Sequence, residues 1–380
     1  MGWLKLKEVG MKDGHIRKLM NIYRRYDELF FEENFRLFNS GLKKNLEKSR
    51  NINLNSKIEL YKRNKVKIID ANSQGYPEKL KELTDYPLFL YVKGKELKKG
   101  LNDERRNIAV VGTRKVTKFG KSACEKIVRE LLEYEVTLIS GLAEGIDTVA
   151  LSASVEKDGS AIAVVGSGLD IVYPYENKIL WEKISENGIL ISEHPLGTKP
   201  LKWNFPKRNR IIAALSDGIL IAESFKSGGA LITAELGFIM DKEIFAVPGF
   251  INYPSFEGCN NLIKENKAKL VTTGEDIARE FLWDLKNKKN KTDKLTYEEK
   301  IVFLQLSEEL GLEEIMKKIK NFNMNSNNND KNRDTLFENE FRPEENSIDI
   351  PINKLLSILM SLKVKGLITE TGTARYMRIV

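Results

Sequence analysis

Residues 108–112 read Ile108-Ala109-Val110-Val111-Gly112, a near-continuous apolar run that ends in a glycine. Such a run is typical of a strand in a parallel sheet that helices cover on both faces. Similar runs follow, separated by segments with helical periodicity. This alternation predicts an α/β fold with an extended Rossmann-like, doubly wound and mostly parallel sheet. The further predicted strands are 136–140, 161–165, 189–192, 218–222 and 244–247, and the predicted helices are 119–134, 146–156, 178–186 and 230–240.

The segment before this core predicts additional structure. A short strand is expected at 66–69, and a second strand is expected to start at Pro87, near a sheet edge. Residues 1–65 have helical periodicity with basic surfaces, which predicts a small helical module of the SAM or helix-hairpin kind. The main domain is therefore expected to span 66–283.

The C-terminal part has a different composition. A Lys- and Asn-rich linker is predicted at 284–296, followed by helices at 297–306 and 312–319. The end of the chain has the order helix, turn, strand, turn, strand, so a winged-helix-like module is predicted over 297–380. An Asn-rich insertion at 321–346 interrupts this module and is predicted to be disordered.

The composition is typical of a globular protein with a polyanionic partner. The 380 residues carry a formal net charge of +8, although basic tails alone could supply such a balance. With two cysteines and two histidines, a disulfide framework and a Cys- or His-based metal centre are not expected, and no cofactor is predicted. The chain start lacks a signal-peptide core and no apolar run could span a bilayer, so a cytoplasmic location without membrane insertion is expected.

The strongest anion-binding candidate is the segment Phe205-Pro206-Lys207-Arg208-Asn209-Arg210. An apolar run follows at 211–215, so the cations are expected at the mouth of a helix, where backbone N–H groups and the dipole favour anions. Pro206 and Asn209 favour a shaped loop, and arginine forks fit phosphate geometry. The alternative is that these cations lie on a solvated helix face.

The loops after the predicted strands are rich in Gly, Ser and Arg. Ligands of open parallel sheets bind outside the carboxyl ends of the strands, where glycine lets the backbone approach them and successive N–H groups bind anions. These loops are therefore predicted to hold phosphates. They match no standard nucleotide fingerprint, because Ile171 stands at the third glycine of G-x-G-x-x-G and Lys115 at the first glycine of a Walker A loop.

Several acidic residues are expected at the same edge of the sheet. A two-metal nuclease would need such carboxylates, but we favour the interpretation that they cap helices and hold the arginines in place. A Ser/His/Asp site is not indicated because His194 has no nucleophile partner, and Cys124 and Cys259 are expected to be buried. The acidic residues are Glu144, Asp147, Glu193, Glu223 and Glu235.

A series of short motifs occurs in order between residues 76 and 249. They are Tyr76-Pro77, Val111-Gly112-Thr113-Arg114, the run from Ser140 to Asp147, Gly168-Leu169-Asp170 with Tyr173-Pro174, Ser192-Glu193-His194-Pro195, the run from Phe205 to Ile212, Thr233-Ala234-Glu235 and Ala246-Val247-Pro248-Gly249. Together they resemble the DprA/Smf family of bacterial DNA-processing proteins. The resemblance implies a homodimer that binds and protects incoming single-stranded DNA and loads RecA onto it during natural transformation or recombination, without catalytic turnover. It also allows single-stranded DNA-binding protein as a partner.

The resemblance also implies roles for individual residues. Arg114 matches the arginine of the family's G-S-R motif, in which Thr113 keeps the hydroxyl group of the serine. Lys207, Arg208 and Arg210 match the basic F-P-x-R-N-R segment. The candidate DNA- and phosphate-binding residues are Gly112, Thr113, Arg114, Lys115, Ser140, Gly141, Gly145, Gly166, Gly168, Phe205, Lys207, Arg208, Asn209, Arg210, Ser227, Gly228 and Gly229.

Two functions compete on these residues. In the favoured hypothesis the cations neutralise DNA phosphates while bases stack on an aromatic side chain such as Phe205 or Phe225. The alternative is a nucleotide-binding or nucleotide phosphoribohydrolase-like enzyme, because residues 227–235 look like the P-G-G-x-G-T-x-x-E loop of those enzymes. Leu231 and Ile232 occupy its Gly and Thr positions, which removes backbone freedom and a phosphate-binding hydroxyl and disfavours hydrolysis.

Overall fold

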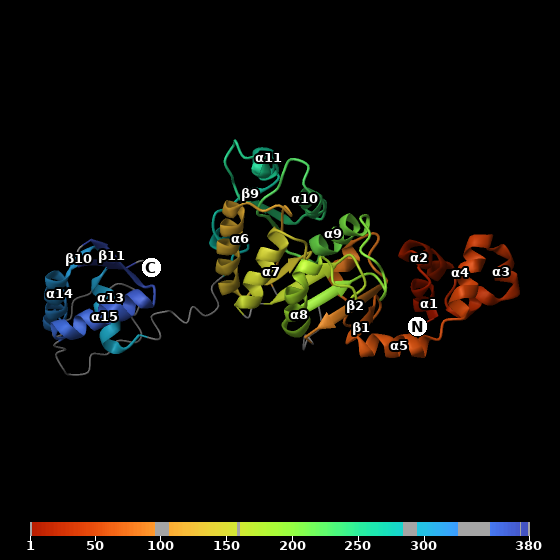
Figure 1. The fold of residues 1–380 in the computed structure, drawn as a ribbon, viewed down its shortest axis with the longest axis horizontal. Coiled ribbons are helices and arrows are strands. Elements are labelled where there is room, and N and C mark those ends of the chain that lie inside the picture. Colours follow the sequence, from red (N-terminus) through yellow and green to blue (C-terminus); the bar gives the residue numbers. More distant parts are fainter. Residues whose placement is uncertain are drawn as a thin grey trace. The chain divides into compact units, whose positions relative to one another are not determined.

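A computed structural model describes residues 2–95, 106–157, 160–283, 295–325, 350–372 and 374–378. The chain divides into two compact units, 1–286 and 287–380 (Figure 1). Within the described ranges, no helix combines the length and the apolar character needed to cross a membrane.

A nine-stranded sheet forms the centre of the described part of the first unit, with the order β1-β2-β6-β5-β4-β3-β7-β8-β9. The strands are β1 (Val66–Asp70), β2 (Phe89–Gly94), β3 (Asn107–Val111), β4 (Thr137–Ser140), β5 (Ala161–Val165), β6 (Ile189–Ser192), β7 (Gly218–Ile221), β8 (Glu243–Ala246) and β9 (Lys269–Leu270). From β6 to β9 all neighbours pair in parallel, whereas β2 is antiparallel to β1 and β6. The predicted mostly parallel sheet is confirmed.

Helices cover both faces of this sheet. They are α6 (Lys118–Leu131), α7 (Ile146–Glu156), α8 (Lys178–Asn187), α9 (Asn204–Leu215), α10 (Gly229–Ile239), α11 (Glu257–Lys264) and α12 (Gly274–Glu280). In β3, Ala109 and Val111 pack with residues of α9, α10 and α11, whereas Ile108 and Val110 pack with residues of α6, α7 and α12. Successive side chains of a strand point to opposite faces, so one apolar run supplies two cores. This arrangement is the doubly wound architecture that the sequence predicts.

A group of N-terminal helices lies on the β1–β2 side of the sheet, with its last helix against β1 (Figure 1). They are α1 (Gly2–Glu8), α2 (Asp13–Ile22), α3 (Glu32–Leu37), α4 (Ser40–Arg50) and α5 (Leu54–Arg63). Tyr61 of α5 stacks on Tyr91 of β2 with ring centres 5.3 Å apart, and its hydroxyl donates to Glu8 of α1 at 2.5 Å. The helices and the sheet therefore share a buried cluster, and the domain boundary at residue 65 stays a prediction.

The second unit contains a small helical core with a three-stranded sheet of order β10-β12-β11. Its elements are α13 (Tyr297–Gln305), β10 (Leu310–Gly311), α14 (Leu312–Asn325), α15 (Ile352–Val364), β11 (Ile368–Gly372) and β12 (Arg375–Arg378). Most of the predicted linker at 284–296 and of the predicted insertion at 321–346 lies outside the described residues. Where the insertion is described, at 321–325, α14 continues as a helix.

Two local predictions are wrong. The strand expected to start at Pro87 begins at Phe89. The basic segment is not a shaped loop, because it lies within the first two turns of α9. Pro206 is accommodated there since it is the third residue of the helix, where a backbone N–H has no intrahelical partner.

Candidate nucleic-acid interface

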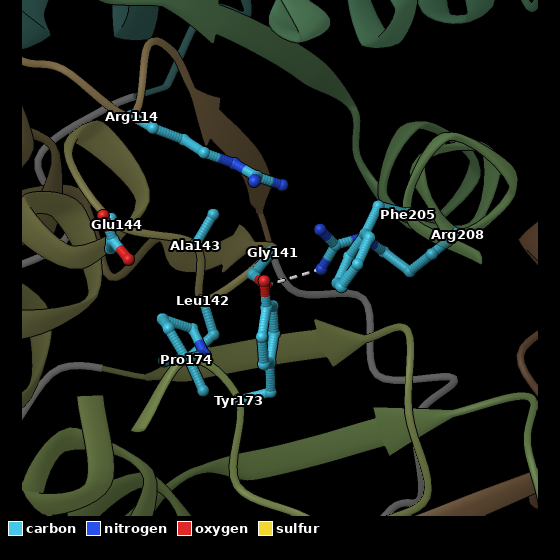
Figure 2. A pocket seen from close by; sticks show the side chains of 9 residues that line it. All are labelled: Arg114, Gly141, Leu142, Ala143, Glu144, Tyr173, Pro174, Phe205 and Arg208. Carbon is cyan, nitrogen blue, oxygen red and sulfur yellow. Dashed lines mark hydrogen bonds between the residues drawn. The ribbon is translucent and has the colours of Figure 1, made fainter. Parts of the chain in front are cut away.

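A pocket lies where the loops after β3, β4 and β5 meet the start of α9 (Figure 2). The lining residues are Arg114, Gly141, Leu142, Ala143, Glu144, Tyr173, Pro174, Phe205 and Arg208. Parallel strands end at a common edge, which brings these distant segments together. The pocket therefore lies at the edge of the sheet that the sequence predicts for ligand binding.

Arg114 follows β3 and extends its exposed side chain across the pocket (Figure 2). Its guanidinium carbon lies 5.6 Å from the centre of the Phe205 ring, within cation–π range. The backbone of Thr113 fixes this loop, because its N–H donates to the carbonyl of Glu223 at 2.8 Å and its carbonyl accepts from the N–H of Ile146 at 3.2 Å. Among the described residues no carboxylate pairs with Arg114, so its charge is available to an anionic ligand.

Gly145 is required for the close approach of this loop to α7. Its φ is +79°, in the left-handed region that favours glycine. A Cβ atom at this position would collide with the carbonyl oxygen of Thr113 and with the backbone of Arg114. The predicted glycine therefore acts by positioning Arg114.

Phe205 and Tyr173 form an aromatic side of the pocket. Their ring centres lie 5.3 Å apart with planes inclined by 33°. Gly166 leaves room for Phe205, since a Cβ there would lie 3.2 Å from the ring. Asn204 donates to the carbonyl of Gly166 at 3.0 Å and anchors the start of α9. Tyr173 is 39% exposed, so the pocket offers an accessible aromatic surface on which a base can stack.

Arg208 lines the pocket but is almost fully buried. Its guanidinium donates to the carbonyl of Gly141 at 2.6 Å and to the carbonyl of Val164. The N–H of Gly141 donates in turn to Asp147 at 3.1 Å. Burial lowers the pKa of Arg208 to about 10, against the opposing charge of Asp147. Arg208 is therefore a cation at neutral pH that ties α9 to the ends of β4 and β5.

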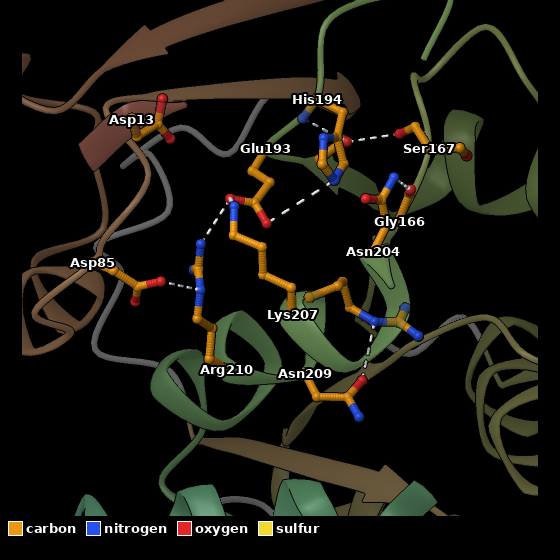
Figure 3. Close-up of polar contacts among 12 residues, drawn as sticks. Asp13, Asp85, Gly166, Ser167, Glu193, His194, Asn204, Lys207, Asn209 and Arg210 are labelled. Atoms are coloured by element: carbon orange, nitrogen blue, oxygen red, sulfur yellow. Dashed lines mark hydrogen bonds and ion pairs between the residues drawn. The ribbon is translucent and has the colours of Figure 1, made fainter. Parts of the chain in front are cut away.

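A second polar group surrounds Glu193, which follows β6 (Figure 3). Its fully buried carboxylate accepts from Arg210 at 2.7 Å and from Lys207 at 3.0 Å, and Arg210 also pairs with Asp85 at 3.0 Å. Burial favours a higher pKa for Glu193, but the charges of Arg210 and Lys207 outweigh it and hold the pKa below its ordinary value. Arg210 is buried, whereas Lys207 is exposed.

We expect His194, beside this group, to make the stability of the protein pH-dependent. Burial lowers its pKa to about 4, against the opposing charge of Glu193, from an ordinary value of 6.5. Below pH 6.5 the unfolded chain takes up a proton at this position and the folded chain does not. The contribution of His194 is therefore complete above pH 6.5 and is lost as the pH falls towards 4. As the pH falls from 6.5 to about 5, proton uptake by the unfolded chain at His194 should lower the free energy of unfolding by about 1.5 kcal/mol.

Urea unfolding at these two pH values measures this effect. The His194→Gln variant should lose the pH-dependent component, because glutamine does not titrate. The matched control is His15→Gln, which removes the exposed second histidine and should keep the wild-type dependence. Identical pH dependence in wild type and His194→Gln would contradict the prediction.

The buried acidic residues of this edge hold loops and cations, as the sequence analysis favours. Asp147 accepts from the N–H groups of Gly141 and Ala143, and Glu223 accepts from the N–H and hydroxyl of Thr117. Among the described residues, no group of three or more His, Cys, Asp or Glu side chains could hold a metal ion. The prediction that both cysteines are buried is confirmed.

Four of the predicted site residues meet in the pocket, namely Arg114, Gly141, Phe205 and Arg208. Others are buried in the structure that supports it: Ser140, whose hydroxyl donates to the carbonyl of Val110 at 2.7 Å, and Gly166, Gly168 and Arg210. The remainder are partly or fully exposed and do not line the pocket: Gly112, Thr113, Lys115, Gly145, Lys207, Asn209, Ser227, Gly228 and Gly229.

The candidate list omits Tyr173 and Pro174, which come from the loop after β5. The only sequence signal for them is the motif Tyr173-Pro174, which has no obvious chemistry by itself. The segment 142–144 was also omitted, although it lies inside the motif that supplies Gly141. Phe225, considered for base stacking, is 39% exposed but does not line the pocket.

The family profile described as "DNA recombination-mediator protein A" matches residues 67–282. The DNA processing protein DprA of Streptococcus pneumoniae is 43% identical over 207 residues, which cover 54% of this chain and 71% of that protein. The DprA of Bacillus subtilis is 38% identical over 224 residues, which cover 59% of this chain and 74% of that protein.

Solved structures give the same relationship. The X-ray structure of DprA from Streptococcus pneumoniae matches with a TM-score of 0.64 and 34% identity, covering 74% of this chain and 98% of that chain. DNA processing protein A from Helicobacter pylori, in a structure described by its single-stranded DNA binding mode, matches with a TM-score of 0.52 and 28% identity. That match covers 57% of this chain and 95% of the other.

Proposed function

Because the chain belongs to the DNA recombination-mediator protein A family, the DprA/Smf proteins, we propose that it acts by binding single-stranded DNA at the pocket. The observation that supports this most directly is the pairing of an exposed cation, Arg114, with the accessible rings of Phe205 and Tyr173. Single-stranded nucleic acid offers a phosphate for the cation and an unpaired base for the rings. In a duplex the base faces are already stacked, so single strands should be preferred.

The predicted cations have different roles in this proposal. Arg114 and the neighbouring Lys115 are exposed and would contact phosphates directly, and Lys207 would join them from α9. Arg208 and Arg210 are buried on protein carbonyls and carboxylates, so they would shape the pocket rather than contact phosphates. The N–H of Gly141 is already bonded to Asp147 and would not bind phosphate.

The family membership supports a proposal for the wider role. We propose that the protein protects single-stranded DNA and loads RecA onto it, as a homodimer in the cytoplasm and without catalytic turnover; single-stranded DNA-binding protein is a further candidate partner. The order α13, β10, α14, α15, β11, β12 supports a winged-helix-like module at the C-terminus. Natural transformation and general recombination would both use these activities.

The test is a binding titration with oligonucleotides of equal length, single-stranded and duplex, over a salt series. With about three phosphate contacts, the logarithm of the single-strand affinity should fall with log salt at a slope of about −2, and duplex should bind more weakly. Incubation with nucleoside monophosphates is the second arm, because release of free base would support the phosphoribohydrolase alternative. Equal affinity for single strand and duplex would contradict the proposed function.

A further inference from the structure

Three exposed aromatic residues gather beside the pocket but do not line it. Phe119, at the start of α6, is 45% exposed, and Phe250 and Tyr253, after β8, are 62% and 52% exposed. The ring centres of Phe119 and Phe250 lie 5.8 Å apart, and those of Phe250 and Tyr253 lie 5.6 Å apart. We call this group the aromatic ledge. Large rings exposed side by side indicate an interaction surface, because single exposed rings are common but clusters are not.

The sheet order places the aromatic ledge next to the pocket. The pocket lies over the ends of β3, β4 and β5. The ledge lies over the ends of β3 and β8, and β7 is the strand between β3 and β8. At a strand spacing of about 5 Å, β8 is about 10 Å from β3. The loop from Arg114 to Phe119 connects the two sites along the same edge. A ligand leaving the pocket beside Arg114 would therefore meet the ledge next.

The loop that presents two of these rings is anchored. The N–H and carbonyl of Gly249 both bond to the side chain of Asn260 at 3.1 Å. A Cβ atom at Gly249 would collide with the ring of Phe256, which is fully buried beneath the loop and lies 5.4 Å from the ring of Phe119. The ring positions are therefore set by packing, which reduces the entropy lost when a ligand binds.

The charges around the ledge fit a polyanion. Lys115, Lys118 and Lys121 are exposed, and among the described residues no carboxylate pairs with them. Lys118 and Lys121 lie at the N-terminus of α6, where the helix dipole disfavours cations. The first turn of α6 contains no acidic residue that would offset this repulsion. An anionic ligand would relieve this repulsion. Unpaired cations interleaved with exposed rings are the pattern that binds single-stranded nucleic acid.

We propose that the aromatic ledge is a second stacking subsite, which continues a single DNA strand from the pocket. This inference rests on the proposed function. Bases stack on Phe250 and Tyr253 while the phosphates between the two sites lie against Lys115, Lys118 and Lys121. Short oligonucleotides fill the pocket alone, whereas longer ones gain affinity from the ledge.

The experiment compares oligothymidylates of about 4 and about 16 nucleotides with wild type and with the Phe250→Ala/Tyr253→Ala variant. Affinity of the variant for the long strand should fall about tenfold or more, while affinity for the short strand stays unchanged. Phe250→Trp should keep the long-strand affinity, because tryptophan also stacks. The matched control is Phe31→Ala, which removes a 46% exposed ring among the N-terminal helices and should bind like wild type.

A direct readout separates stacking from protein association. A long strand with 5-iodouracil at each position should photo-cross-link to Phe250 or Tyr253 as well as to the pocket. Cross-links confined to the pocket, with unchanged long-strand affinity in the double variant, would overturn the subsite and leave the proposed function standing. The subsite would also be overturned, with the proposed function still standing, if the double variant changed the oligomeric state of the protein while the cross-links to the pocket stayed in place. Failure of wild type to bind either strand would instead contradict the proposed function.

Discussion

Replacing Glu193 with alanine is expected to lower the free energy of unfolding by about 3–5 kcal/mol at neutral pH. The carboxylate is fully buried and accepts from both Arg210 and Lys207. Its loss would leave Asp85, which is itself half exposed, as the one remaining carboxylate that pairs with the buried Arg210 guanidinium in the described part of the chain. An uncompensated buried charge is the main cost of breaking such a pair.

Urea unfolding of two further variants tests this explanation. Glu193→Gln keeps the shape and one acceptor oxygen but removes the charge, so it should be less destabilising than alanine. Glu176→Ala removes an exposed carboxylate from the short 3-10 helix before α8 and should change stability by less than about 0.5 kcal/mol. A loss of less than about 1 kcal/mol in Glu193→Ala would mean that water or a rearranged Asp85 compensates Arg210.

The core of the fold was predictable because its strands are buried on both faces. The central strands are four or five residues long with buried apolar centres, and the observed limits differ from the predicted ones by one residue at most. Strand β9 has no sequence signal, because both of its residues, Lys269 and Leu270, are exposed. An edge strand of two exposed residues has neither the alternation nor the apolar content that identifies a strand.

The site was predictable in its loops but not in the burial of its cations. The loop interpretation of 205–210 ignored the helical periodicity of this segment. In the helix, Phe205 lies on the same face as Arg208, and Lys207 lies on the same face as Arg210. Burial of Arg208 and Arg210 also depends on acceptors from distant strands, which no local pattern reveals. Arg114, which the family motif assigns to phosphate binding, follows a buried strand at the carboxyl edge and is exposed there, and its role stays a prediction.

Replacing Arg114 with alanine is expected to weaken single-stranded DNA binding about a hundredfold at low salt. A charge-assisted phosphate contact contributes about 1.5–3 kcal/mol to the binding free energy. The cation–π contact with Phe205, which orders the pocket, adds about 0.5–1 kcal/mol. Stability should change little, because the side chain is exposed and no carboxylate in the described ranges pairs with it. Fluorescence anisotropy with a labelled oligothymidylate measures the affinity.

The salt dependence identifies the cause of this loss. Removing one phosphate contact should reduce the slope of log affinity against log salt by about 0.7 for a single strand. Arg114→Lys should keep the slope and lose only part of the affinity, because lysine retains the charge but not the planar fork. Arg63→Ala removes an equal charge from an exposed position on α5, away from the sheet edge, and is the control for net charge. If Arg63→Ala and Arg114→Ala weakened binding equally, the positive charge of the whole protein, rather than the pocket, would account for its affinity.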